Sequence, residues 1–190
     1  MSHHKHTIEA FVIQVTPSRE HDARIKLVTK DGEVLTAIAT GLRTLKSKLR
    51  MTIVPYALAK VSLVKGKDMW RLTNAQSVRN FFAEMPESEK RKALARTVSL
   101  VEKLTPGESH VGNIFEKLIE YAEILIKEKV EEKNDRLKAY ETQAALKILA
   151  ELGYIENTEK WNNADIEYIN THIKEAVQDV NHGIKSTHLM

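Results

Sequence analysis

Residues 24–39 read Arg24-Ile-Lys-Leu-Val-Thr-Lys-Asp-Gly-Glu-Val-Leu-Thr-Ala-Ile-Ala39. In the first part, the apolar residues Ile25 and Leu27 alternate with charged residues, which is the period-two pattern of a strand with one buried face. The Asp-Gly dipeptide at 31–32 is typical of a tight hairpin turn, and a second strand pattern follows at 33–39. We therefore predict an antiparallel hairpin over residues 24–39.

Three further segments have the composition of strands, at residues 7–15, 56–64 and 69–78. The first is rich in β-branched and aromatic residues and is apolar on both faces around Phe11, which indicates an interior strand. Five strands in about 75 residues, joined by short connections, predict a small antiparallel barrel. Both the OB-fold and the SH3-like barrel fit this pattern, and periodicity alone does not separate them.

The connection between the third and fourth predicted strands is strongly basic. It reads Gly41-Leu-Arg-Thr-Leu-Lys-Ser-Lys-Leu-Arg-Met-Thr-Ile-Val-Pro55, and we call it the basic stretch. Arg43, Lys46, Lys48 and Arg50 lie within eight residues of one another, with no acid between them. Cations at this density repel each other unless solvent or a polyanion neutralises them. Charge alone leaves open both a solvated loop and a nucleic-acid contact.

The net charge of +3 over 190 residues conceals a division between the two halves of the chain. Residues 1–79 carry 14 Lys and Arg against 6 Asp and Glu, a balance of +8, and residues 80–190 carry 15 against 20, a balance of −5. This division is typical of a polyanion-binding module joined to a neutral or acidic one. Five further cations of the first half are predicted to help the basic stretch in binding: Arg19, Arg24, Lys65, Lys67 and Arg71.

From Phe81 the apolar period changes from that of strands to that of helices. Four amphipathic helices are predicted, and we expect them to form a bundle. The first helix is predicted to start within residues 84–89 and to end at Pro106-Gly107, and the second to start at Ser109 or His110. The third is predicted over residues 135–152 with Gly153 as its C-terminal cap, and the fourth to start near Asn163 or Asp165. The predicted fold class is therefore α+β, with a barrel domain at 1–80 and a helical domain at 81–190.

No pattern of catalytic or metal-binding residues is found. The chain has no cysteine, which excludes disulfides and cysteine-based zinc sites, and its glycines form no phosphate-binding loop. The pair His21-Asp22 is interpreted as a polar turn rather than as a catalytic or ligand pair. We expect no enzyme activity, no cofactor and no metal. Without a run long enough to cross a bilayer, we expect no membrane association and a cytoplasmic location.

Aromatic residues on the predicted strands could stack on nucleic-acid bases. For Phe11 a core position is the favoured interpretation. Tyr56 and Trp70 leave both roles open, and Trp161 is expected to pack against the end of the helical bundle.

The order of these features resembles the bacterial DNA repair and recombination-mediator family RecO. The basic stretch is similar to the family pattern G-x-R-x-x-x-S-x-L followed by a proline and apolar residues. The segment Tyr140-Glu-Thr-Gln-Ala-Ala-Leu-Lys-Ile-Leu-Ala-Glu-Leu-Gly-Tyr154 is similar to a family helix that ends in Leu-Gly-Tyr. The segment Gly183-Ile-Lys-Ser-Thr-His-Leu189 is similar to the Lys-Ser-containing end of the family.

This resemblance implies an N-terminal five-stranded OB-fold followed by a helical domain. It also implies a non-catalytic function. This function consists of binding single- and double-stranded DNA, annealing complementary strands, and helping to load a recombinase onto strands coated by single-strand-binding protein. The implied partners are a RecR-like protein and the acidic C-terminal tail of single-strand-binding protein. Many members carry a four-cysteine zinc site after the Gly-Tyr turn, where this chain has residues 155–161 without cysteine.

Two other functions remain open at this point. An RNA-binding adaptor could use the same small barrel, and the 2′-hydroxyl of RNA would distinguish it from a DNA-binding protein. A protein-interaction scaffold, in which the basic surface has no ligand, is the second alternative.

Overall fold

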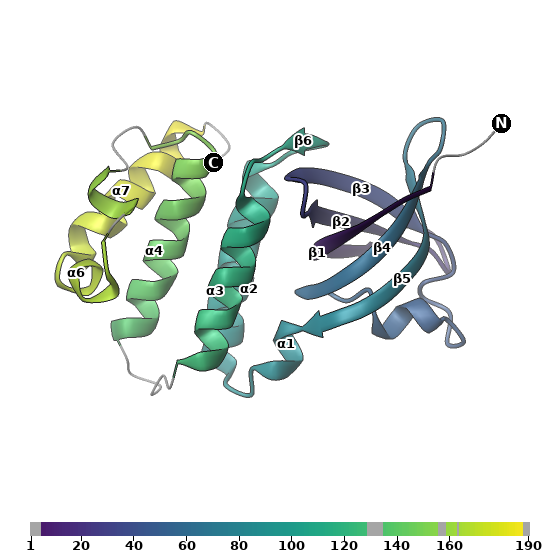
Figure 1. Cartoon of the computed structure of the whole chain (residues 1–190), viewed down its shortest axis with the longest axis horizontal. Helices are drawn as coiled ribbons and strands as arrows, with labels where there is room; N and C mark the ends of the chain where they lie inside the picture. Colours follow the sequence, from purple (N-terminus) through teal and green to yellow (C-terminus); the bar gives the residue numbers. More distant parts are fainter. Residues whose placement is uncertain (1–4, 129–134, 156–158, 163, 188–190) are drawn as a thin grey trace. The chain divides into compact units, whose positions relative to one another are not determined.

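The computed structural model describes residues 5–128, 135–155, 159–162 and 164–187 (Figure 1). The chain forms two compact units. The first consists of Met1–Glu84 together with Thr105–His110, and the second consists of Met85–Leu104 and Val111–Met190. The domain boundary near residue 80 stays a prediction. Several stretches singled out above lie partly outside the described residues: 155–161, 183–189 and the start of the fourth predicted helix at Asn163.

The first unit is a closed five-stranded barrel of the OB-fold type (Figure 1). β1 pairs with β2 and β4, β2 also pairs with β3, and β5 joins β4 to β3. Only the β3–β5 pairing is parallel, and it closes the ring. The strands agree closely with the predicted segments: β1 Lys5–Pro17, β2 Ala23–Thr29, β3 Glu33–Ala39, β4 Ala57–Lys65 and β5 Trp70–Asn80.

Small side chains fill much of the barrel interior. Its buried core alternates large residues such as Ile25, Leu27 and Leu63 with six alanines, which are Ala10, Ala23, Ala37, Ala39, Ala57 and Ala59. A narrow closed sheet has room for only a few large side chains in its interior. Alanine at positions that face one another across the barrel lets the opposite walls come close together. Register shifts in β1 and in the β4–β5 pair increase the local bend that closure needs.

A short segment from later in the chain, residues 105–110, completes the first unit. Residues 105–110 run along the barrel, and their strand β6 (Ser109–His110) pairs with β3 at Glu33 and Val34. The helix predicted to start at Ser109 or His110 was therefore placed too early. Its first residues pair with a strand edge instead, and the helix begins only at Ile114.

The helices of the second unit are α2 Ser88–Leu104, α3 Ile114–Lys127, α4 Asp135–Glu151, α5 Glu159–Asn162, α6 Ile166–Thr171 and α7 Ile173–Ser186. The first of the two segments that make up the first unit ends in the short helix α1, Phe81–Glu84. The fourth predicted helix was expected to be continuous, but it is divided at His172, whose backbone leaves the helical conformation with φ −105° and ψ 24°. The apolar residues keep the same helical spacing on both sides of this break, so their periodicity in the sequence does not predict it.

Helix α4 is the centre of the helical unit, with contacts to α2, α3, α5, α6 and α7. Trp161 is buried among α4, α6 and α7 residues, and its indole Nε1 donates to Asp179 Oδ2 at 2.8 Å. The predicted packing role of Trp161 is confirmed. No helix among the described residues is long and apolar enough to cross a membrane.

Glu151, at the end of α4, caps the start of α3. Its Oε1 accepts from the Asn113 amide at 2.9 Å, and its Oε2 lies 2.9 Å from Lys117 Nζ. Gly112 makes this approach possible, because a Cβ there would lie 2.3 Å from the carboxylate and its φ is +55°. The Asn113 amide, and then the Lys117 ammonium, hold the pKa of Glu151 below its ordinary value.

Replacing Glu151 by Gln should lower the free energy of unfolding at pH 7 by about 1 kcal/mol, because the cap loses its charge at the positive end of α3. A carboxyl with a lowered pKa in the folded state stabilises above its ordinary pKa of 4.5, and this contribution is lost as pH falls through the folded pKa. The wild type and Glu151→Gln should therefore converge in urea unfolding as the pH falls below 4.5 and through the folded pKa of Glu151.

The matched control is Glu120→Gln, which removes an exposed carboxylate paired with Lys147. This change should cost less than about 0.5 kcal/mol. A constant gap between wild type and Glu151→Gln from pH 7 to pH 3 would contradict the role assigned to the Glu151 charge.

Candidate nucleic-acid interface

The basic stretch is an ordered series of turns fixed to the end of the barrel. Leu42 and Ile53 are buried in the barrel core, and Leu49 packs against it. Backbone hydrogen bonds at 2.8–3.3 Å link successive turns from Gly41 to Ile53, and a short 3-10 helix, η1, spans Lys48–Met51. Because alternate turns are anchored by apolar side chains, the charged residues between them are held outward.

The basic stretch is also joined to the β1–β2 loop. Asp22 Oδ1 accepts from the Gly41 amide at 2.8 Å, where Gly41 adopts φ +69°. The Arg43 amide donates to the His21 carbonyl at 2.9 Å, and its guanidinium Nη1 donates to the carbonyls of Arg19 and Glu20 at 3.1 and 3.2 Å. Asp22 therefore has a structural role in the loop, and Arg43 brings Arg19 next to the basic stretch.

Lys46, Lys48 and Arg50 differ from Arg43 in having no partner among the residues that the structure describes. All three are exposed, and within the described ranges none of them has an ion pair or a side-chain hydrogen bond. Their positive charge is therefore available to a ligand. Arg43 keeps its charge too, but part of its guanidinium is used inside the protein.

Two further predicted cations lie on the outer face of the barrel in one row. Arg24 on β2 is level with Ile38 on β3, and Ile38 is level with Arg71 on β5. Both arginines are exposed and Ile38 is half-buried, whereas Ala37 and Ala39 on either side of it point into the core. Strands lie about 4.8 Å apart, so the row places the two arginines about 10 Å apart across an apolar side chain.

Lys65 and Lys67 lie at the β4–β5 turn, beyond this row. Both are exposed, and Lys65 Nζ lies 5.4 Å from the centroid of the Trp70 ring. Trp70 packs partly against the barrel core. Its ring is therefore covered on one side by Lys65, so Trp70 is not a freely exposed stacking surface.

The other two aromatic residues are also engaged within the barrel unit. Phe11 is buried and stacks on Phe81 with the ring centroids 6.0 Å apart, so its predicted core position is confirmed. Tyr56 precedes β4 with φ +67°, and its ring stacks on Phe82 at 5.2 Å. Burial raises the pKa of Tyr56.

Sequence reasoning missed that the chain itself occupies part of the outer face. Lys26, the neighbour of Arg24 on that face, donates from Nζ to the Thr105 carbonyl at 2.6 Å. The pairing of β6 with β3 covers the same end of the sheet. A Pro-Gly pair after a helix gave only a turn signal, so the return of residues 105–110 to the barrel had no local signature in the sequence.

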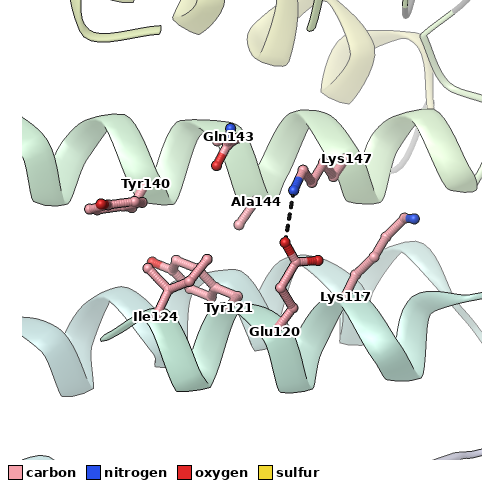
Figure 2. Close-up of a pocket in the computed structure, with 8 residues that line it drawn as sticks. All are labelled: Lys117, Glu120, Tyr121, Ile124, Tyr140, Gln143, Ala144 and Lys147. Carbon is pink, nitrogen blue, oxygen red and sulfur yellow. Dashed lines mark hydrogen bonds and ion pairs between the residues drawn. The ribbon is translucent and has the colours of Figure 1, made fainter. Parts of the chain in front are cut away.

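The cations of the helical unit are placed differently from those of the barrel, since many are matched by acids. Arg96 donates to both carboxylate oxygens of Glu141 at 2.6 Å, and Lys147 Nζ lies 3.1 Å from Glu120. Figure 2 shows the latter pair beside a pocket between α3 and α4, whose free volume of about 10 Å³ holds no more than one water. Among the described residues, no group of three or more His, Asp or Glu side chains could hold a metal ion.

A larger groove of about 330 Å³ lies on α2, α4 and α7. Leu100, Val180 and Ile184 supply apolar surface. The charged residues of its lining are Lys103 and the ion pair of Arg96 with Glu141. Arg96 was considered as a possible extension of the basic surface, with solvation of the helix surface as an equal alternative, and the other residues of the groove were given no binding role.

Residues 1–81 match the family model described as recombination protein O, N terminal. This match covers the whole barrel, including all nine predicted cations. Over this N-terminal domain the chain is similar to the RecO family. It is 29% identical over 101 residues to the DNA repair protein RecO of Heliobacterium modesticaldum, a match that covers 53% of this chain and 37% of that RecO. The family model ends before α2, so the helical unit lies beyond the matched N-terminal domain.

Because Arg43 has a structural contact that Lys46 lacks, their alanine substitutions should differ. Arg43→Ala should lower the free energy of unfolding by about 1 kcal/mol through the loss of hydrogen bonds to the β1–β2 loop. Lys46→Ala should change it by less than about 0.5 kcal/mol. Urea unfolding of the two variants measures the difference, and equal stabilities would show that the Arg43 contacts do not hold the loop.

Proposed function

We propose that this chain is a non-catalytic, DNA-binding recombination mediator in DNA repair, which binds DNA through its barrel. The proposal is supported mainly by three exposed cations, Lys46, Lys48 and Arg50, that have no protein partner in the described chain and are held on an anchored loop. Arg43 and five helpers extend the positive surface: Arg19, Arg24, Lys65, Lys67 and Arg71. The similarity of residues 1–81 to the RecO N-terminal domain supports DNA repair as the context.

Single- and double-stranded DNA are both proposed ligands, because phosphate neutralisation needs no base sequence. Strand annealing follows from the same electrostatics. A positive surface that neutralises two backbones lowers the repulsion between complementary strands, so no bond-making group is needed. Helping a recombinase to load on coated single strands is the biological role that we propose for this activity.

Two protein partners are proposed, a RecR-like protein and the acidic C-terminal tail of single-strand-binding protein. The groove on α2, α4 and α7 combines apolar residues with Lys103, whose charge is left over after Arg96 pairs with Glu141, and this excess of positive charge suits an acidic peptide. We propose no zinc site for this chain, since it has no cysteine.

The salt dependence of binding tests the electrostatic part of the proposal. If about four phosphates of a single strand are neutralised, log affinity should fall with log salt at a slope near −3. Replacing Lys46, Lys48 and Arg50 together by Ala should make this slope shallower by about 2, since each lost contact removes about 0.7. Fluorescence anisotropy with a labelled oligonucleotide gives both slopes.

A matched control removes the same charge from the helical unit. Lys127, Lys147 and Lys160 are each ion-paired with a glutamate, and their replacement by Ala should leave the slope unchanged. An equal loss of slope in both triple variants would mean that net charge, rather than the basic stretch, sets the affinity. Tighter binding of an RNA oligomer than of the matched DNA would contradict the assignment to DNA.

Annealing should proceed without nucleotide or metal. The protein should accelerate the pairing of two complementary labelled strands in the presence of a metal chelator and the absence of ATP. The Lys46, Lys48 and Arg50 triple variant should lose most of this acceleration. A requirement for ATP or for a divalent metal would contradict a purely electrostatic role.

A further inference from the structure

Two large apolar side chains project from the basic stretch into solvent. Leu45 is 90% exposed and Met51 is 82% exposed, against 50% for Val78 and 40% for Tyr168, the other exposed large hydrophobic residues in the described part of the chain. Single exposed apolar residues are common on proteins and mean little by themselves. Here, however, the two most exposed ones lie among the four cations of one short segment.

The fold of the segment explains why these side chains cannot turn inward. Leu42, Leu49 and Ile53 already occupy the positions that pack on the barrel core, and the backbone hydrogen bonds between them fix the turns. Leu45 lies in the turn that the hydrogen bond from the Ser47 amide to the Thr44 carbonyl closes, and Met51 ends the 3-10 helix η1. Neither contributes to the core, so the free energy of folding gives no reason for an apolar residue at either position.

A ligand that fits the segment must offer negative charge and apolar surface together. Single-stranded nucleic acid does so, because its backbone carries phosphates and its unpaired bases expose apolar faces. Inserted leucine and methionine side chains contact and unstack bases in other DNA-binding proteins. The outer face of the barrel has the same composition, with Ile38 exposed in part between Arg24 and Arg71.

We propose that Leu45 and Met51 contact the nucleobases of the bound single strand, while the neighbouring cations contact its phosphates. This inference rests on the proposed DNA-binding function and adds a second component to it. Phosphate contacts weaken steeply with salt, whereas apolar contacts with bases do not. The affinity that remains at high salt should therefore depend on Leu45 and Met51.

The test compares two oligonucleotides of equal length, one normal and one in which every nucleotide lacks its base. The wild type should bind the normal strand about tenfold more tightly, which corresponds to burying roughly one large apolar side chain. The double variant Leu45→Ala, Met51→Ala should lose this preference while keeping its affinity for the abasic strand and its salt slope. Val78→Ala, the control at an exposed apolar residue of β5, should keep the preference.

A second double variant tests the same contacts by an increase in affinity for the normal strand. Leu45→Phe, Met51→Phe should increase the preference for the normal strand several-fold, because aromatic rings stack on bases better than aliphatic chains do. Circular dichroism and thermal unfolding of each variant show whether the barrel is intact. Since both positions are exposed, the folded state should be unaffected.

Other outcomes would overturn the inference. Equal affinity of the wild type for both strands, or an equal loss of affinity for both strands in the alanine variant, would show that Leu45 and Met51 do not read bases. Binding to anionic vesicles that depends on these two residues, with no preference between the strands, would assign them to a lipid surface instead. Failure to bind either strand would contradict the proposed function itself, which distinguishes the two failures.

Discussion

The parallel pairing of β3 with β5 closes the barrel, and the geometry of the candidate interface depends on that closure. Ala37 lies level with Trp70 and Ile38 level with Arg71. Because side chains alternate along each strand, this register places the alanine inside the barrel and the arginine outside it. A shift by one residue would exchange the two faces, so Arg71 would lose its place beside Ile38 and Arg24.

Closure also fixes where the loops project. The antiparallel pair of Ala23 with Ala39 brings the end of the β1–β2 loop to the start of the basic stretch. Asp22 and Arg43 then join the two loops by hydrogen bonds. The register thus places Arg24 and Arg71 in one row, and the hydrogen bonds join Arg43 to Arg19. The path that we propose for a bound strand connects these positions. It runs from the β4–β5 turn across the β5–β3–β2 row to the two joined loops.

The two units differ in how far their cationic side chains are paired with carboxylates. In the helical unit, lysines and arginines are largely matched by glutamates, as in the Arg96–Glu141 and Lys117–Glu151 pairs. In the basic stretch, buried apolar anchors hold like charges near one another in spite of their repulsion. A protein that only had to fold would gain from acids in this segment, and the excess of positive charge there agrees with the binding surface that we propose.

Much of the barrel could be predicted from sequence, because alternation, the Asp-Gly turn and the length of each connection are local signals. The choice between OB-fold and SH3-like barrel depends on which strands pair, and the long-range β3–β5 pair has no local signature. The same is true of the return of residues 105–110 to β3, and of the contacts that distinguish Arg43 from Lys46. Leu45 and Met51 were overlooked because a helical or turn pattern does not show which apolar residues are buried.

The central claim is that the barrel, and not the helical unit, contacts the nucleic-acid strand. Chemical acetylation of lysines followed by mass spectrometry measures this directly, with and without a saturating single-stranded oligonucleotide. The account predicts that Lys46, Lys48, Lys65 and Lys67 lose reactivity when the strand is bound, while Lys127, Lys147 and Lys160 keep theirs. Protection of the helical lysines with unchanged reactivity in the basic stretch would contradict it.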